Sequence, residues 1–148
     1  MSIKVLLADD HAVVRDGLRM LLETQPDIRV VGEAPDGRTA VRRVKELVPD
    51  VAVLDVAMPE LNGIEAATQI RDLCPTTRVV ILSMHSTREH IYRALQAGVQ
   101  GYVLKEAAGA EVVAAVRAAH AGRRFLSQRI SDSVVDDYVA RHRATESE

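Results

Sequence analysis

The 148-residue sequence predicts an α/β fold, a parallel sheet with helices on both faces. Two observations carry this prediction. Five short apolar runs alternate with five helical patterns along the chain, which is the arrangement expected of successive βαβ units. Four of the runs are followed by, or run into, residues that can handle a phosphoryl group, and open α/β sheets bind ligands at the carboxyl ends of their strands.

The first half of the chain contains two such strand and helix pairs. Residues 3–8, with the apolar run Val5-Leu6-Leu7-Ala8, predict a strand, and the spacing of valine and leucine after it predicts a helix over residues 12–24. Residues 28–33 include Arg29 and Glu33, whereas fully buried parallel strands are almost continuously apolar. We therefore expect this strand at an edge of the sheet. A helix over residues 38–48 follows and ends at Pro49.

Three further pairs complete the pattern. A strand over residues 51–54 is followed by Asn62, whose spacing from Glu65 predicts a capping box for the third helix. Residues 78–82 and 101–104 predict the last two strands. Helices are expected over residues 88–97 and 110–121, with Gly122 as the C-terminal cap of the second.

The pattern changes after Gly122, so we predict a main domain over residues 1–122 and a linker over 123–148. Phe125 and Leu126 form a short apolar anchor, and Ser131 is expected to cap a helix over residues 131–143. The apolar face of that helix would consist of Ile130, Val134, Val135, Tyr138 and Val139. Because a lone helix of about a dozen residues is marginal in water, this face needs a partner: the same domain, a second copy or further sequence. Residues 144–148 are expected to be disordered.

Composition excludes several classes of function. A net charge of −2 provides no basic field for nucleic acid or acidic membranes. No apolar stretch approaches the roughly 18–20 residues of a membrane span. The chain runs from Met1 directly into its first strand, which leaves no room for a signal peptide. Cys74 is the only cysteine and is expected to be a small structural residue, so we expect a cytoplasmic protein.

The polar residues at the strand ends indicate phosphoryl chemistry. Asp55 follows the third run and is the candidate phosphoacceptor, since a carboxylate can attack phosphorus as a nucleophile. Asp9 or Asp10, after the first run, would hold Mg²⁺ together with Asp55, because magnesium takes carboxylate oxygens. Ser83 and Lys105, after the fourth and fifth runs, complete the group; a lysine can neutralise the charge of a transferring phosphoryl group.

Each of these residues taken alone has a simpler explanation. Asp9 and Asp10 could favour the start of the following helix through its dipole. Lys105 could be an ordinary surface lysine, and Ser83 a turn residue or cap. The prediction of a site rests on all of them reaching one edge of the sheet. We expect His11 to start the first helix at the rim rather than bind metal, because magnesium prefers oxygen donors. His85 and His90 are expected to be solvated.

These motifs together resemble the receiver domain of bacterial two-component response regulators. The resemblance covers residues 3–121 and rests on Asp9-Asp10, on Asp55 with Met58-Pro59 and Gly63, on Ser83, and on Gly101-Tyr102-Val103-Leu104-Lys105. It implies a flavodoxin-like five-stranded sheet of order 2-1-3-4-5. It also implies phosphoryl transfer to Asp55 from the phosphohistidine of a sensor histidine kinase.

The resemblance implies roles for the individual residues as well. Asp10 and Asp55 would hold Mg²⁺ with the backbone carbonyl of Ala57, and with Asp9 through water. Ser83 and Lys105 would grip the phosphate, and Tyr102 would be an aromatic switch. We expect phosphorylation to draw Ser83 inward, shift the loop over residues 84–87 and change the rotamer of Tyr102. The alternative is that Tyr102 is a half-buried core aromatic with one fixed rotamer.

Finer details are similar to the NarL/FixJ group, whose members carry a LuxR-type helix-turn-helix domain after the receiver. The similar segments are Asp9-Asp10-His11, Leu82-Ser83-Met84-His85 and Leu104-Lys105-Glu106-Ala107. The tail contains no helix-turn-helix pattern, so the sequence either ends in a linker, which we favour, or is a stand-alone receiver acting through protein contacts. DNA would be bound only through that further domain, and a homodimer is expected.

Two rival functions are less consistent with the sequence. A phosphatase of the haloacid dehalogenase type also forms an aspartyl phosphate, but its nucleophile follows the first strand in an Asp-x-Asp pattern. Here the first strand ends in adjacent acids, and the candidate nucleophile follows the third. A flavin or nucleotide binder would need a glycine-rich loop after the first strand, and the sequence has none there.

We also expect deletion of residues 123–148 to leave phosphorylation of Asp55 largely intact.

Overall fold

The computed structural model describes residues 2–132 and 139–140. Its elements alternate along the chain as follows: β1 (Ile3–Ala8), α1 (Ala12–Glu23), β2 (Ile28–Ala34), α2 (Gly37–Leu47), β3 (Val51–Asp55), α3 (Gly63–Leu73), β4 (Arg78–Ser83), α4 (Arg88–Gln96), β5 (Gly101–Leu104), a 3₁₀ turn (Lys105–Ala107), α5 (Ala108–His120) and β6 (Phe125–Leu126). Residues 128–132 are also helical.

The strands form one sheet in the order β2-β1-β3-β4-β5-β6, and every neighbouring pair is parallel. The α/β class, the order 2-1-3-4-5 and the place of β2 at an edge are therefore confirmed. The sixth strand is not among the predicted elements. It contains only Phe125 and Leu126, which pair with Gly101 and Tyr102, so it continues the sheet beyond β5.

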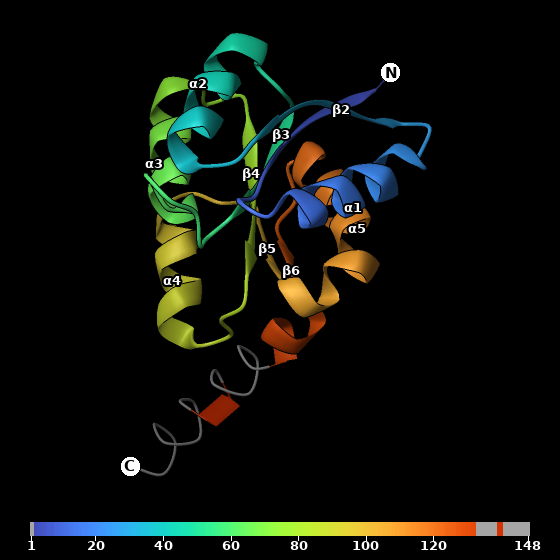
Figure 1. The fold of residues 1–148 in the computed structure, drawn as a ribbon. Helices are drawn as coiled ribbons and strands as arrows, with labels where there is room; N and C mark the ends of the chain where they lie inside the picture. Colours follow the sequence, from blue (N-terminus) through green and yellow to red (C-terminus); the bar gives the residue numbers. More distant parts are fainter. Residues whose placement is uncertain (1, 133–138, 141–148) are drawn as a thin grey trace.

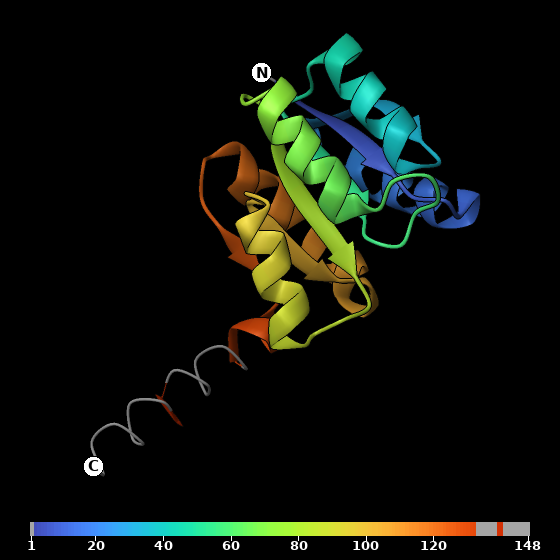
Figure 2. The same cartoon turned by 90° about the vertical axis from the view of Figure 1, so that its left-hand side faces the viewer.

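Helices cover both faces of this sheet (Figures 1 and 2). α2, α3 and α4 lie on one face, and α1 and α5 lie on the other. Side chains alternate between the two faces along each strand, so two separate cores form. Leu6 and Tyr102 belong to the core under α2, α3 and α4, whereas Leu7 and Val103 belong to the core under α1 and α5.

Short polar side chains set the starts of two helices. Asp36 accepts a hydrogen bond from the Thr39 amide at 2.7 Å and caps α2. Asn62 accepts from the Glu65 amide at 2.9 Å, and its own side-chain amide donates to the Glu65 carboxylate at 2.6 Å. Asn62 therefore caps α3, as its spacing from Glu65 predicts. α5 begins at Ala108, two residues earlier than expected, because the 3₁₀ turn leads directly into it.

The chain after α5 returns to the sheet. Gly122 has φ +78°, a left-handed conformation suited to glycine, and accordingly ends the helix as predicted. The helix that follows starts at residue 128 rather than at Ser131, because the Ser127 carbonyl accepts from the amides of Ile130 and Ser131 at 2.9 Å each. Ile130 is fully buried. The expected apolar positions at 134, 135 and 138, and residues 144–148, lie outside the described residues.

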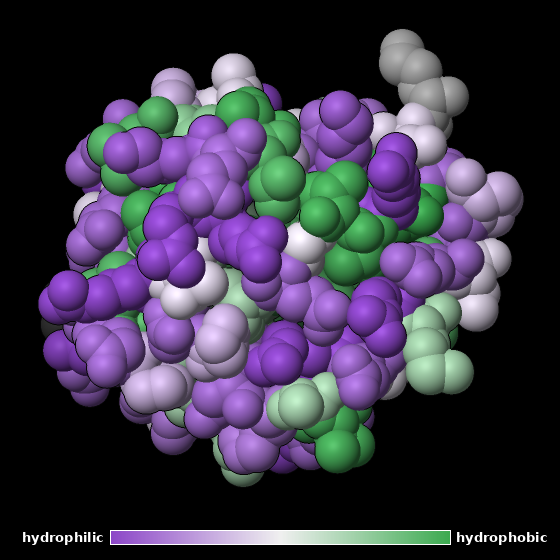
Figure 3. Space-filling model, turned by 45° about the horizontal axis from the view of Figure 1, so that its top comes forward, coloured by the Kyte–Doolittle hydropathy of each residue, from purple (hydrophilic) through white to green (hydrophobic). Residues whose placement is uncertain are grey.

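The surface visible in Figure 3 is largely hydrophilic, with apolar side chains in separate patches. Cys74 is buried, which fits a small structural residue, and its sulfur lies 3.3 Å from the Thr77 hydroxyl. Among the described residues, no helix combines the length and apolar character needed to cross a membrane.

Candidate functional site

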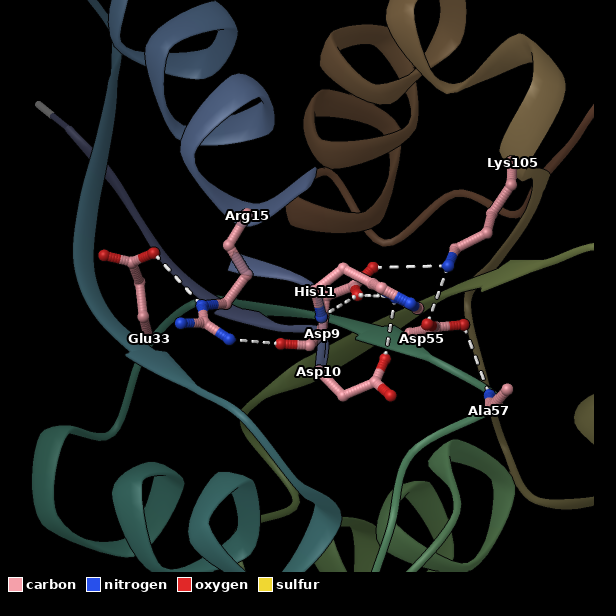
Figure 4. Close-up of polar contacts among 8 residues, drawn as sticks. All are labelled: Asp9, Asp10, His11, Arg15, Glu33, Asp55, Ala57 and Lys105. Atoms are coloured by element: carbon pink, nitrogen blue, oxygen red, sulfur yellow. Dashed lines mark hydrogen bonds and ion pairs between the residues drawn. The ribbon is translucent and has the colours of Figure 1, made fainter. Parts of the chain in front are cut away.

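The parallel strands bring the predicted site residues to one edge of the sheet. Asp9 follows β1, Asp55 and Ser83 end β3 and β4, and Lys105 follows β5. Figure 4 shows Asp9, Asp55 and Lys105 pointing toward one another above the strand ends. Asp9 and Asp55 are 1% and 2% exposed, so both carboxylates lie in the interior, whereas Asp10 is exposed at the rim.

Lys105 is the cation of this cluster. Its Nζ donates to Oδ2 of Asp55 at 2.8 Å and lies 3.4 Å from Oδ2 of Asp9. One ammonium group therefore faces two buried acids, which leaves the interior of the site with an excess of negative charge. Its position also excludes an ordinary surface role for Lys105.

The pKa values of this pair reflect burial and proximity. Burial raises the pKa of Asp55, the hydrogen bond from Lys105 opposes that rise, and the nearby charge of Asp9 adds to it. For Lys105, burial alone would lower the pKa, but the hydrogen bond and charge of Asp55, with help from Asp9, outweigh it and raise the pKa. The lysine thus stays charged, whereas ionisation of Asp55 costs more free energy in the folded protein than in water.

The buried acids Asp9 and Asp55, with Asp10 at the rim, have the composition of a magnesium site. Ligand atoms of Asp9, Asp10, His11 and Asp55 all lie within 4.8 Å of one another. Oδ2 of Asp9 is buried and accepts no hydrogen bond from the part of the chain that the structure describes, although the Lys105 ammonium lies 3.4 Å from it, so this oxygen can accept from a bound ion or its water. Carboxylate oxygens on a partly open rim fit the preference of Mg²⁺ for oxygen ligands and retained water.

His11 lies at the N-cap position of α1, as predicted, and is exposed. Its Nδ1 is 3.0 Å from the Asp10 carboxylate and 3.4 Å from that of Asp9, while its amide donates to Oδ1 of Asp9 at 2.9 Å. The ring and the amide of His11 therefore contact the two acids from the solvent side.

A second cation holds the backbone of Asp9 and is not among the predicted site residues. Arg15 donates through Nη1 to the Asp9 carbonyl at 2.5 Å, and its Nε lies 3.5 Å from Oε1 of Glu33 (Figure 4). Arg19 reaches the other oxygen of Glu33 at 3.0 Å. The helical spacing of Arg15 and Arg19 is visible in the sequence, but nothing in it indicates a pairing across to β2.

The loop after β3 closes tightly over the acceptor. The Ala57 amide donates to Oδ1 of Asp55 at 3.2 Å, which places Ala57 beside the carboxylate. The Gly63 amide donates to the carbonyl of Val56 at 3.0 Å. A Cβ atom at Gly63 would lie 2.3 Å from the backbone oxygen of Asp55, so only glycine fits where α3 begins.

Ser83 and Tyr102 are both tied to His85 in the loop after β4. The Ser83 hydroxyl accepts from the His85 amide at 3.0 Å, and the Tyr102 hydroxyl donates to the His85 carbonyl at 2.7 Å. Tyr102 is 1% exposed. Burial raises its pKa, which a hydrogen bond from Ser83 partly opposes. His85 is exposed and its ring stacks on that of His90, with 4.1 Å between centroids.

The structure thus brings together the acids, hydroxyl and ammonium that the sequence indicated. Ser83 and Lys105 also line one pocket, together with Met84, Ser86, Leu104, Glu106 and Arg129. The site therefore contains a buried carboxylate beside an ammonium, further acids close to it and an adjoining pocket. These are the groups needed to accept a phosphoryl group and neutralise its charge.

Comparison with known proteins agrees with this geometry. Residues 5–117 match the family described as response regulator receiver domain. The chain is 41% identical over 139 residues to the uncharacterized transcriptional regulatory protein YhcZ of Bacillus subtilis, covering 94% of this chain and 64% of that protein. It is 37% identical over 137 residues to the oxygen regulatory protein NreC of Staphylococcus haemolyticus, covering 92% and 63% respectively.

A solved structure shows the same fold. The LuxR-family two-component response regulator of Aurantimonas superposes with a TM-score of 0.89 at 38% identity, over 94% of this chain and 99% of that one. The two curated relatives are longer, since the chain spans only 63–64% of their length.

Proposed function

The chain belongs to the response regulator receiver domain family, and from this membership we propose that it is a switch operated by phosphorylation of Asp55. The donor would be the phosphohistidine of a sensor histidine kinase. The observation that carries the proposal is the buried contact of Asp55 with Lys105, with Asp9 beside both. This arrangement prepares a nucleophile and a charge-neutralising group at one point.

The proposed reaction forms one bond and breaks one. An oxygen of the Asp55 carboxylate attacks phosphorus while the bond from phosphorus to the donor nitrogen breaks, and the imidazole leaves with the bonding electrons and takes up a proton. Lys105, already 2.8 Å from Asp55, needs little movement to reach the incoming phosphoryl oxygens. Ser83, at the end of the neighbouring strand, offers a hydroxyl donor from the same pocket.

We propose that Asp10 and Asp55 hold Mg²⁺ directly, with the Ala57 carbonyl, and that Asp9 acts through water. The bound ion supplies positive charge against the equatorial oxygens of the phosphoryl group. The buried oxygen of Asp9 that accepts no hydrogen bond from the described residues supports this assignment, since it can accept one from water held by the ion. Without an ion, the mutual repulsion of the acids contributes to the raised pKa of Asp55.

The output belongs to the proposal as well. The YhcZ relative is described as a transcriptional regulatory protein, and the Aurantimonas structure as LuxR family. We propose that this receiver, acting as a homodimer in the cytoplasm, controls a LuxR-type DNA-binding domain that would follow residue 148. The net charge of −2 makes DNA binding by the receiver itself unfavourable.

Acetyl phosphate and Mg²⁺ test the proposed acceptor. Intact-mass measurement should show one added phosphoryl group on the wild type and none on Asp55→Asn, and chelating the magnesium should abolish the gain. Asp72→Asn is the matched control, because Asp72 is an exposed acid on α3 that pairs with its neighbour Arg71, away from the strand ends. Equal labelling of Asp55→Asn and wild type would refute the assignment.

A further inference from the structure

The chain after β6 makes a second set of contacts around Lys105, on the edge of β5 opposite β4. The Ser127 amide donates to the Tyr102 carbonyl at 3.0 Å, which extends the pairing of β5 and β6 by one bond. The next donor of β5, the Leu104 amide, is bonded instead by the Ser127 hydroxyl at 2.9 Å. Ser127 is 1% exposed, so water cannot replace this bond.

A carboxylate from α5 fixes the orientation of that hydroxyl. Ser127 Oγ donates to Oε1 of Glu111 at 2.6 Å, while Oε2 of Glu111 accepts from the Gln128 amide at 3.1 Å. Glu111 lies in the first turn of α5, where the helix dipole favours a negative charge. The Ser127 hydroxyl therefore accepts a hydrogen bond from the Leu104 amide at the end of β5 and donates one to Glu111 at the start of α5.

The residue after Lys105 is also held by the tail. Glu106 forms an ion pair with Arg129, two residues beyond Ser127. Both side chains are largely exposed, so this pair adds little energy by itself. Ile130, however, is fully buried in the core that contains Tyr102 and Leu104, and it anchors the same turn. Both sequence neighbours of Lys105 are thus bonded to residues 127–129.

We propose that Ser127 is a positioning residue for Lys105. By fixing the Leu104 backbone against α5, it determines where the Lys105 side chain starts and hence how its ammonium meets Asp55 and Asp9. Displacements of about 1 Å in such arrangements change rates by up to roughly 100-fold. Movement of residues 125–130 would therefore alter phosphorylation, and phosphorylation would in turn alter the hold on the tail. This inference rests on the proposed function of Asp55.

The test compares three serine variants in the full chain. Ser127→Ala removes the hydroxyl, Ser127→Thr keeps it, and Ser131→Ala is the control, since the Ser131 hydroxyl makes a long 3.4 Å bond to Leu126 in the same turn. At saturating Mg²⁺, phosphorylation by acetyl phosphate should slow about tenfold in Ser127→Ala. Ser127→Thr should restore most of the rate, and Ser131→Ala should match the wild type.

Magnesium affinity separates positioning from general destabilisation. Asp9, Asp10 and Asp55 are untouched by these changes, so folded Ser127→Ala should bind Mg²⁺ at least as tightly as the wild type, because an ammonium that moves away from Asp55 and Asp9 competes less for them. Exchange of the Leu104 amide should be faster, and the NMR signal of Lys105 Nζ should shift. An unchanged phosphorylation rate in folded Ser127→Ala, or a parallel loss of rate and Mg²⁺ affinity, would overturn the proposal.

Two further arms keep the test decisive. If Ser127→Ala fails to fold, Glu111→Gln replaces it, because glutamine keeps a side-chain oxygen but weakens the bond from Ser127. Glu111→Gln should also slow phosphorylation, and a wild-type rate in this variant would count against the proposal. If even the wild type gains no phosphoryl group, the function assigned to Asp55 fails. The shift of Lys105 Nζ between Ser127→Ala and Ser131→Ala then tests the positioning separately, and its absence refutes it.

Discussion

Asp55, the proposed phosphoacceptor, is a buried acid whose ionised form would attack phosphorus yet is disfavoured by its surroundings. Burial raises its pKa, Lys105 opposes the rise and Asp9 adds to it. A carboxyl with a native pKa above its unfolded value binds its proton more tightly when folded. Its ionisation therefore costs no stability below the ordinary pKa of 3.8, and costs the full amount once the pH exceeds the native pKa.

The first residue-scale prediction follows from the raised pKa of Asp55. Without Mg²⁺, at about pH 7, Asp55→Asn should be more stable than the wild type, because it removes a charge that is costly there. Lys105 keeps Asp9 as its partner, 3.4 Å away. The advantage should shrink as the pH falls through the raised native pKa of Asp55 and should vanish below about 4. Chemical denaturation at each pH measures the free energy of unfolding of the wild type and of the variant. Added Mg²⁺ should stabilise the wild type more than the variant.

Asp72→Asn provides the comparison for an exposed acid and should show little change. A variant less stable than the wild type at neutral pH would mean that the bond between Asp55 and Lys105 outweighs the cost of burial.

Ser83 carries the second residue-scale prediction, which concerns transmission. A serine hydroxyl can accept one hydrogen bond and donate another, so Ser83 can keep the His85 amide while its donor turns from Tyr102 to a phosphoryl group. Tyr102 holds the carbonyl of the same His85 at 2.7 Å. Ser83→Ala should therefore still accept phosphate on Asp55, but the NMR shifts that phosphorylation causes in α4 and β5 should be smaller.

Ser86→Ala is the matched control, because Ser86 lines the same pocket three residues further along the loop. Its phosphorylation-dependent shifts should equal those of the wild type. Undiminished shifts in Ser83→Ala would rule out coupling through this hydroxyl.

At the scale of single elements, α2 ends in an unfavourable conformation. Val48, its C-cap, has φ 45° and ψ 58°, and a β-branched residue pays about 1–2 kcal/mol in this left-handed region. Val48 is half-exposed, so little packing is lost by replacing it. Allowing for the greater freedom of glycine in the unfolded chain, Val48→Gly should raise the free energy of unfolding by about 0.5–1 kcal/mol.

Val48→Ala is the control for that measurement, since alanine keeps the Cβ atom that makes the conformation costly. Its stability should stay near that of the wild type. A destabilised Val48→Gly would show that the valine side chain packs more strongly than its exposure indicates.

Elements are predictable from the sequence where their patterns are long. The strands β1, β3, β4 and β5 are almost continuously apolar because both faces of the sheet are covered, and the charged positions of β2 mark it as an edge. β6 is not predictable because a strand of two residues is too short to show the alternation of apolar and polar side chains. The start of the helix after it is predicted too late, since Ser131 has the residue type of a cap but Ser127 lies where the chain turns.

The site divides in the same way. Asp9, Asp55, Ser83 and Lys105 are predictable because parallel strands bring their ends together, so position in the sequence implies proximity. Contacts that depend on side-chain reach are not. Arg15 bonds to the Asp9 backbone, and Ser127 bonds to Leu104. Neither contact follows a period or a motif, and each joins residues whose approach depends on the finished packing.

At the scale of the whole molecule, residues 123–132 are part of the folded body. The sequence alone favours a linker whose removal leaves phosphorylation intact. In the structure, Phe125 and Leu126 extend the sheet, and Ser127 and Ile130 are buried. Removing them exposes the edge of β5 and the core beside Tyr102, next to the strand end that carries Lys105. We now expect the effect of a deletion to depend on where it begins.

Two truncations test this expectation. A chain ending at residue 132 keeps Ser127 and Ile130 and should retain the stability and phosphorylation rate of the full chain. A chain ending at Gly122 loses the burial of Ile130 and other contacts, and should be less stable by about 2–5 kcal/mol, the usual cost of emptying an isoleucine site. It should also accept phosphate from acetyl phosphate more slowly, because Leu104 no longer has the Ser127 hydroxyl. Equal stability and rate in the two truncations would restore the view that the receiver ends at α5.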